Sequence, residues 1–343
     1  MIFGAHGRHW LGGLLGVLLA GAGLNGAACA ADFELVALGV HGGLSDGNLS
    51  SYLVRAPGRP HYLALDAGSV LPGIAAARAQ GAFADSQPPA DDPLTPAGYV
   101  FRQAIRAYFI SHAHLDHVEG LLIGATADVG PKPIYGLAST LDVLSTDYFN
   151  WQAWPNFADR GAPPTLGRYL LTAESPRQPF AVADTGLSGA LYPLTHDRVT
   201  SSMILLRHGD VYLAYFGDTG ADAVQHSALL GQAWQALAPL LRRHALRAIV
   251  IECSYPDDVP DAQLFGHLNP AWLLRELHRL AQAAGGPESL RGLTVLVTHI
   301  KPSLLAGRDP SALIAAQLAA GNDLGVRFVY PRQGQRFLLP APR

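Results

Sequence analysis

Three histidines and one aspartate fall within six residues of one segment, Ser111-His112-Ala113-His114-Leu115-Asp116-His117. The segment follows an apolar run typical of a strand and precedes a run typical of a helix. In an extended loop, a spacing of two places His112 and His114 on the same side, while the turn into the helix directs Asp116 and His117 to a second point. The segment therefore predicts ligands for two neighbouring metal ions, which a polar surface loop would not explain.

The order His-x-His-x-Asp-His after a strand resembles the signature of the metallo-β-lactamase superfamily. The resemblance implies an α/β protein with the metallo-β-lactamase fold, a four-layer αββα sandwich of two mixed β-sheets flanked by helices. It also implies two bound zinc ions, although manganese or iron would suit such ligands too. The additional ligands that two ions need are expected from later strand ends, and His196, Asp218 and His299 follow in the superfamily's order.

The resemblance also divides these residues between the two ions. The expected ligands are His112, His114 and His196 for one zinc, Asp116, His117 and His299 for the other, and Asp218 as a bridge between them. Asp66, in Leu65-Asp66-Ala67-Gly68, matches an early aspartate of the superfamily. We expect Asp66 to orient the histidine segment through a hydrogen bond rather than to bind metal itself.

Two further residues match an acid and a histidine that phosphodiesterase members of the superfamily carry before their last zinc ligand. Glu252 ends a predicted strand, and His267 lies in Phe265-Gly266-His267-Leu268. The alternative role for His267 is entry to a helix, because Asn269 would cap a helix that begins at Pro270. We interpret the pair as functional, since β-lactamases and thioesterases of the superfamily lack it.

The segment from His112 to Ile123 is similar to the signature of class II 3′,5′-cyclic-nucleotide phosphodiesterases. Later blocks are similar too: Glu252-Cys253-Ser254-Tyr255, Gly266-His267-Leu268 and Thr298-His299-Ile300-Lys301-Pro302. The resemblance runs from about residue 33 to the C-terminus. One departure follows Ile123, where the family expects a serine and then Ala or Pro, but this chain has Ala125-Thr126. The change concerns specificity more than chemistry, because no expected ligand is affected.

The resemblance implies zinc-dependent hydrolysis of cAMP, cGMP or both to nucleoside 5′-monophosphates. We expect a hydroxide held between the metal ions to attack phosphorus in line with the leaving 3′-oxygen. His267, oriented or charged by Glu252, is the expected proton donor to that oxygen. The candidate catalytic residues are therefore Asp116, Glu252 and His267. Base preference and the acceptance of 2′,3′-cyclic substrates do not follow from the sequence.

A group of aromatic residues near the start of a long polar segment is suited to stacking on a purine. Its members are Tyr148, Phe149, Trp151, Trp154 and Phe157. Ordinary packing against the body of the protein is the expected role for most of them. One or two are expected to line the pocket for the base.

Alternating strand and helix patterns supply the elements that must position these residues. Strand patterns occupy residues 33–40, 52–55, 62–65, 107–110, 203–207, 211–216, 248–252 and 293–297. Helical patterns occupy residues 74–80, 117–123, 139–149, 221–244, 270–284 and 311–320. Neighbouring strand patterns that could form hairpins favour mixed sheets, and the predicted helices would cover the faces of these sheets. Residues 82–96 and 150–185 are predicted to be insertions that shape a site.

The first thirty residues are typical of a secretory signal peptide. Arg8 precedes an apolar run from Trp10, and Ala28-Cys29-Ala30 offers small residues for cleavage. A membrane anchor and a lipoprotein acylated at Cys29 are the alternatives, but glycines interrupt the run. We expect cleavage after Ala30, a periplasmic location and one catalytic domain over residues 31–343. Cys253 would remain as the one thiol, expected in a buried strand.

The formal net charge of −3 gives no electrostatic footprint for nucleic-acid polymers or anionic membranes. A small cyclic nucleotide is therefore the expected partner, and a homodimer remains open. Two other functions also remain open: a two-zinc hydrolase of another phosphodiester, a lactone or a β-lactam, and a periplasmic zinc-binding protein without activity. Hydrolysis of such other substrates would not explain the presence of Glu252 and His267. The second does not explain why all seven ligands are present.

Overall fold

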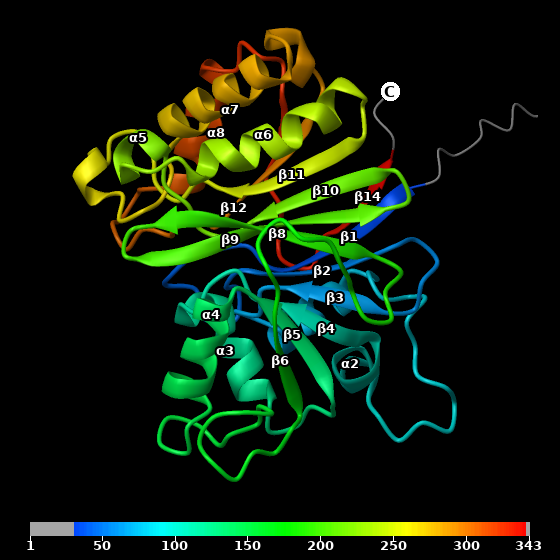
Figure 1. Ribbon diagram of the computed structural model, residues 1–343. Helices are drawn as coiled ribbons and strands as arrows, with labels where there is room; N and C mark the ends of the chain where they lie inside the picture. The colour runs from blue at the N-terminus through cyan, green and yellow to red at the C-terminus, as the bar shows by residue number, and fades with distance from the viewer. Residues whose placement is uncertain (1–30, 341–343) are drawn as a thin grey trace, which may run out of the picture.

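The computed structural model describes residues 31–340, so the predicted signal peptide lies outside the described residues. Two seven-stranded sheets pack face to face, and helices cover the outer face of each sheet (Figure 1). The predicted αββα order of layers is confirmed. Within residues 31–340, no helix is long and apolar enough to cross a bilayer.

The first sheet comes from the N-terminal half of the chain, with one strand added from the C-terminal end. In spatial order its strands are β14 (Arg336–Pro340), β1 (Ala31–Gly39), β2 (Ser51–Arg55), β3 (Tyr62–Leu65), β4 (Ile105–Phe109), β5 (Lys132–Gly136) and β6 (Tyr169–Ala173). The strands from β14 to β3 pair antiparallel, and those from β3 to β6 pair parallel. Its helical elements are α1 (Leu71–Ala79), α2 (Pro96–Tyr99), α3 (Leu115–Gly124), α4 (Ala138–Val143) and the π-helical turns η1 (Val100–Ala104) and η2 (Leu144–Tyr148).

The second sheet comes from the C-terminal half. Its strands are β13 (Arg327–Val329), β12 (Thr294–Thr298), β11 (Leu246–Glu252), β10 (Val211–Phe216), β9 (Val199–His208), β8 (Ser188–His196) and β7 (Phe180–Ala181). The strands from β10 to β13 are parallel, and those from β7 to β10 are antiparallel. Its helical elements are α5 (Asp222–Gln225), α6 (Leu229–Arg242), α7 (Pro270–Ala284), α8 (Pro310–Ala320) and the short turns η3 (Asp261–Gln263) and η4 (Pro287–Leu290).

Most strands are buried on both faces, which explains their continuous apolar sequences. In β1, Phe33, Leu35 and Ala37 belong to the core between the two sheets. The alternate residues Val36 and Leu38 belong to the core beneath the helices of the first sheet. Successive side chains of a strand point to opposite faces, so one strand contributes to two cores. Burial on both faces holds the strand ends firmly in place.

The predicted helix over residues 221–244 is wrong as a single element. The structure has α5 and α6 instead, and the chain turns at His226, whose φ is 49°. Asp222 causes the break, because its carboxylate accepts hydrogen bonds from the backbone N–H groups of Leu230 (3.1 Å) and Gly231 (2.8 Å). The side chain that begins one helix thus caps the next.

Residues 150–185, predicted to be a long insertion, also contribute strands to the two sheets. The segment contains β6 and β7, which form one edge of each sheet. Edge strands pair on one side only, and β6 alternates between buried and exposed positions, so its apolar signal is weak. The sequence pattern also does not predict the neighbouring strand β5, because Pro133 lies within it.

Candidate active site

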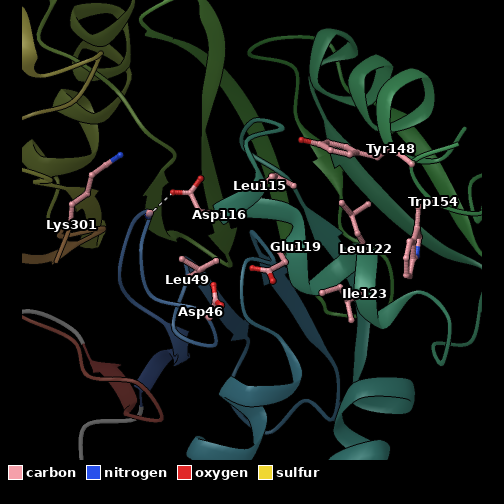
Figure 2. Close-up of a pocket in the computed structure, with 12 residues that line it drawn as sticks. Asp46, Leu49, Leu115, Asp116, Glu119, Leu122, Ile123, Tyr148, Trp154 and Lys301 are labelled. Carbon is pink, nitrogen blue, oxygen red and sulfur yellow. Dashed lines mark hydrogen bonds between the residues drawn. The ribbon is translucent and has the colours of Figure 1, made fainter. Parts of the chain in front are cut away.

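The candidate residues gather where several strands end at the same side of the sandwich. β4 leads through a short loop into α3, whose first turn carries Asp116 (Figure 2). From the second sheet, β8 ends at His196, while Asp218, Glu252 and His299 lie at or just beyond the ends of β10, β11 and β12. Parallel strands with the same orientation end at a common edge, which brings residues distant in sequence together.

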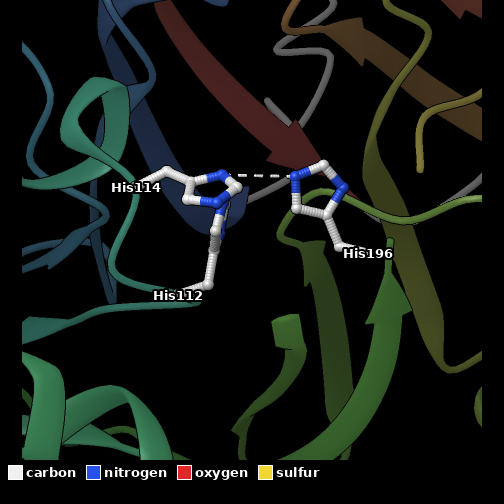
Figure 3. A group of neighbouring side chains, drawn as sticks. All are labelled: His112, His114 and His196. Carbon is white, nitrogen blue, oxygen red and sulfur yellow. Dashed lines mark hydrogen bonds between the residues drawn. The ribbon is translucent and has the colours of Figure 1, made fainter. Parts of the chain in front are cut away.

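All seven predicted metal ligands lie in this cluster. In each of two groups, the candidate ligand atoms lie within 4.8 Å of one another: His112, His114 and His196 (Figure 3), and Asp116, His117 and His299. These are the two sets that the resemblance implied. Among the described residues, three further groups meet the same limit: His112, His117 and Asp218; His196, Asp218 and His267; and Glu252, His267 and His299. Each implied set combines residues of the first sheet's α3 loop with a histidine from the second sheet.

Asp218 lies between the two groups. One carboxylate oxygen is 3.8 Å from Nε2 of His112, and the other is 3.3 Å from Nε2 of His117. The first oxygen is also 3.2 Å from Nε2 of His299. A carboxylate in this position can bridge two metal ions, the role that the resemblance implied for Asp218.

Four histidines of the cluster have one ring nitrogen held by a neighbour. The Nδ1 contacts are His112 with Ser111 Oγ (3.1 Å), His117 with Asp66 Oδ2 (2.9 Å), His196 with the Gly266 carbonyl (2.9 Å) and His299 with Ser254 Oγ (2.9 Å). Holding Nδ1 in this way fixes the ring and leaves Nε2 for a metal ion.

Two ring nitrogens of the cluster indicate whether a metal ion would fit between these residues. Nε2 of His112 and Nε2 of His117 are buried, and neither makes a well-aligned hydrogen bond within the described part of the chain, although an Asp218 oxygen lies 3.3 Å from Nε2 of His117. A buried polar atom without a partner is unfavourable and demands an explanation. A metal ion would satisfy both atoms, and the mixture of histidines and carboxylates suits zinc.

Gly266 shows how closely the backbone approaches one of these rings. Its φ is 80°, and a Cβ at this position would lie 2.4 Å from the Asp197 backbone nitrogen and 2.8 Å from Nδ1 of His196. Only glycine leaves room for its carbonyl to reach His196.

Asp66 is fully buried and accepts four hydrogen bonds. Its donors are the Ser111 backbone N–H (2.7 Å), the Ser111 hydroxyl (2.8 Å), His117 Nδ1 (2.9 Å) and the Tyr215 hydroxyl (2.9 Å). Its φ of 53° is uncommon, though aspartate tolerates it better than most residues. The position fits the predicted role of holding the histidine segment.

Glu252 and His267 form a buried pair beside the ligand groups. Oε1 of Glu252 accepts from Nδ1 of His267 at 2.8 Å and from the Thr219 backbone N–H at 2.9 Å. Oε2 accepts from the Ser254 hydroxyl at 2.6 Å and from the Leu268 N–H at 3.2 Å. Burial alone would raise the pKa of Glu252, but His267 lowers it overall. An ionised carboxylate therefore orients the His267 ring.

The electrostatics of the site favour a cation between its carboxylates. Burial and the neighbouring histidines lower the pKa of His114 to about 4, so this ring is neutral and able to bind metal. Burial also opposes a charge on His117, yet the carboxylates of Asp218 and Asp66 raise the pKa of His117 well above its usual value. The position thus attracts positive charge, which metal ions would provide.

Two adjoining cavities open at this cluster. The smaller, of about 260 Å³, is lined by predicted ligands and His267 together with Arg198 and Lys301. The larger, of about 770 Å³, extends along α3 and is lined mostly by apolar side chains (Figure 2). Asp116 and Lys301 line both cavities. A ligand can therefore place a charged group in the first and an apolar group in the second.

Residues 33–334 match the family described as cAMP phosphodiesterases class-II. The chain belongs to this family. It is 51% identical over 304 residues to a probable 3′,5′-cyclic-nucleotide phosphodiesterase of Yersinia pestis, covering 89% of this chain and 88% of that protein. It is 44% identical over 310 residues to a 3′,5′-cyclic-nucleotide phosphodiesterase of Aliivibrio fischeri, covering 90% and 93%.

Solved structures show the same fold. Unliganded yeast PDE1 superposes with a TM-score of 0.81 at 24% identity, covering 90% of this chain and 100% of that one. The metallo-β-lactamase-fold protein YhfI of Bacillus subtilis gives a TM-score of 0.58 at 16% identity, covering 89% and 98%. The predicted metallo-β-lactamase fold is therefore confirmed for this class-II family member.

The aromatic group of this class-II phosphodiesterase is divided among the larger cavity, the core and the surface. Tyr148 and Trp154 line the larger cavity. Phe149 and Phe157 are buried in the core beneath the first sheet's helices, and Trp151 is 43% exposed. Two of the five therefore serve packing, and two line the cavity in which a base could be contacted.

Several residues of the site were not singled out in the sequence. The Ser254 hydroxyl links Glu252 to His299, but a serine after a strand carries no distinctive signal. Arg198 and Lys301 each follow a predicted ligand by two residues, which could have been noticed. Cys253 is buried in the core of the second sheet, as predicted, and burial raises the pKa of its thiol.

Proposed function

We propose that the protein hydrolyses 3′,5′-cyclic nucleotides to nucleoside 5′-monophosphates with two zinc ions bound in the cluster. The observation that carries the proposal is the His267–Glu252 pair, held at 2.8 Å beside both ligand groups. Hydrolysis of a lactone or β-lactam would not explain why this buried pair is present. Membership of the class-II phosphodiesterase family supports the same substrate class.

The seven clustered residues would hold the metal. His112, His114 and His196 would bind one ion, Asp116, His117 and His299 the other, and Asp218 both. Zinc ions there would neutralise charge on the phosphate oxygens and make water a better nucleophile. Arg198 and Lys301 line the same cavity and add positive charge that attracts the anionic phosphate.

His267 would supply the proton that the leaving group needs. Hydrolysis adds one water across the bond between phosphorus and the 3′-oxygen, so the water oxygen ends on phosphorus and a proton ends on the 3′-oxygen. With Nδ1 of His267 held by Glu252, the proton donor to the 3′-oxygen is Nε2. The ionised Glu252 stabilises the charged ring before the proton is transferred.

The test is turnover of 3′,5′-cAMP by the zinc-loaded protein, followed by phosphorus NMR with metal analysis. We expect 5′-AMP as the product and two zinc ions per chain. His114→Ala should abolish turnover, whereas His278→Ala should not, because His278 lies outside the cluster and pairs with Asp323 at 2.9 Å. Failure of the fully zinc-loaded protein to hydrolyse either cAMP or cGMP would overturn the proposal.

We further propose that the protein is exported to the periplasm and that residues 1–30 are removed. The support is the order of Arg8, the apolar run and Ala28-Cys29-Ala30. N-terminal sequencing of the protein released by osmotic shock should begin at Ala31. Recovery of chains that begin at Met1 in the cytoplasmic fraction alone would contradict export.

A further inference from the structure

The larger cavity contains two carboxylates that the proposed hydrolysis does not use. Glu119 projects from α3, and Asp46 comes from the loop between β1 and β2 (Figure 2). Asp46 is exposed, whereas Glu119 is half-buried on a helix. A carboxylate repels an anionic substrate unless the substrate gives it a hydrogen-bond donor. A hydrogen-bond donor on the substrate would therefore explain why Glu119 lies beside the site proposed for the phosphate.

Helix α3 sets the distance between the phosphate end and Glu119. Asp116, Glu119 and Ile123 are spaced by three and four residues, so they share one face of the helix, and all three line the cavity. A rise of 1.5 Å per residue places Glu119 about 4.5 Å and Ile123 about 10.5 Å along the axis from Asp116. Glu119 thus lies between the Asp116 end and the Ile123 end of the cavity, as the sugar of a nucleotide lies between its phosphate and its base (Figure 2).

The chemistry of the substrate leaves one candidate donor at the sugar. In a 3′,5′-cyclic nucleotide the 3′ and 5′ oxygens are both esterified, so the 2′-hydroxyl is the sugar's only hydroxyl group. An ionised carboxylate is a strong acceptor for such a donor. Glu119 and the 2′-hydroxyl therefore match in both position and chemistry.

The base end of the cavity is apolar by comparison. Leu122, Ile123 and Trp154 line it, and the Tyr148 hydroxyl is engaged because it donates to the Ala113 carbonyl at 2.9 Å. Such a surface provides stacking and apolar contact, which all purines accept. The indole N–H of Trp154 has no hydrogen-bond partner among the described residues, but it is buried in the wall and not presented to the cavity.

We propose that Glu119 accepts a hydrogen bond from the 2′-hydroxyl and is the specificity-determining residue for ribose. The enzyme then selects ribose over 2′-deoxyribose but discriminates little between adenine and guanine. This inference rests on the proposed hydrolysis of cyclic nucleotides. It assigns the selection to a single side chain one helical turn from the predicted ligand Asp116.

The experiment compares kcat/KM for 3′,5′-cAMP and its 2′-deoxy analogue in the zinc-loaded enzyme. The wild type should prefer cAMP by about tenfold or more, as expected for a hydrogen bond to a charged group. Glu119→Ala should lose most of that preference by slowing cAMP alone. Asp46→Ala removes the same charge from the same cavity and should change both substrates in parallel. cGMP should be turned over within about threefold of cAMP.

The outcomes separate this inference from the proposed function. Equal turnover of cAMP and its 2′-deoxy analogue by the wild type would overturn the role of Glu119 and leave the hydrolysis intact. No turnover of either would refute the hydrolysis itself. If Glu119→Ala fails to fold, Glu119→Met, which has a similar length and no strong acceptor, replaces it with the same pair of cyclic substrates. An unchanged ratio in a folded variant would also overturn the role.

Discussion

The two adjoining cavities differ in how firmly their side chains are held. In the cluster on which the smaller cavity opens, Asp66 and Glu252 each accept four hydrogen bonds, and four histidines have Nδ1 fixed by a neighbour. In the larger, Leu115 and Ile123 are 60% and 58% exposed and contribute apolar surface. One cavity has side chains in a single arrangement, and the other offers a surface that different bases can contact.

This difference predicts where substitutions act. Changes in the smaller cavity should alter metal content and kcat, because they affect groups that contact the reacting atoms or hold those groups in place. Changes in the larger cavity should alter KM, because they remove contact area that is present in both the bound substrate and the transition state.

The largest effect is expected for Asp218→Ala. Asp218 lies within 3.8 Å of His112 and within 3.3 Å of His117, so its loss removes the group shared by both predicted ion sites. Loss of metal charge on the phosphate should lower kcat by about a thousandfold or more, which corresponds to several kcal/mol. The kcat and the zinc content per chain would be measured together. Asp210→Ala, on an exposed turn, is the control. A variant with wild-type kcat would contradict the shared role.

His267→Ala should keep the metal and lose proton transfer. We expect kcat for cAMP to fall by about 100- to 10,000-fold, the usual contribution of a general acid, with unchanged zinc content. The sharper readout is bis(p-nitrophenyl) phosphate, whose leaving group needs no proton. Its hydrolysis should change little in the variant. Equal losses with both substrates would instead assign His267 to metal binding or to structure.

Asp66→Asn should weaken metal binding without removing a ligand. An amide cannot accept all four hydrogen bonds, so His117 would lose its fixed orientation. Zinc affinity should fall by about 10- to 100-fold, measured by competition with a chelator.

The matched control for Asp66 is Asp128→Asn. Asp128 is also buried and accepts from Lys132 Nζ at 2.6 Å and from the Tyr169 hydroxyl at 3.0 Å, away from the cluster. Both variants should lower the melting temperature, but only Asp66→Asn should change zinc affinity. If both change it alike, the effect of Asp66 is one of stability.

The smaller cavity was largely predictable, because its residues follow strands and lie in short motifs. The spacing from His112 to His117 alone indicates two ion sites, and buried strands bring distant motifs to one edge. Ser254 was not predictable, because its role depends on contact with Glu252 and His299, which are separated along the chain. Such contacts have no local signature.

The larger cavity and the edges of the sheets were less predictable. The sequence pattern does not predict β5, because Pro133 lies within it. It does not predict β6, because alternating exposure weakens the apolar signal. The break before α6 depends on the Asp222 side chain capping backbone groups eight and nine residues later. In the sequence, Glu119 does not differ from other acidic residues of helices, and only the structure shows that it lines a cavity. Cavity shape follows from packing, which residue types alone do not determine.

The smallest effect is expected for Trp154→Ala in the larger cavity. If Trp154 stacks on the base, the variant should raise KM for cAMP by about tenfold and leave kcat close to that of the wild type. Trp151→Ala is the control, because the Trp151 indole N–H donates to the Pro164 carbonyl at 2.9 Å and the ring does not line the cavity. A fall in kcat without a change in KM would show that the two cavities are coupled, because the aromatic wall would then help to place the phosphate. A tenfold change in KM alone would mean that the base is bound separately from the chemistry.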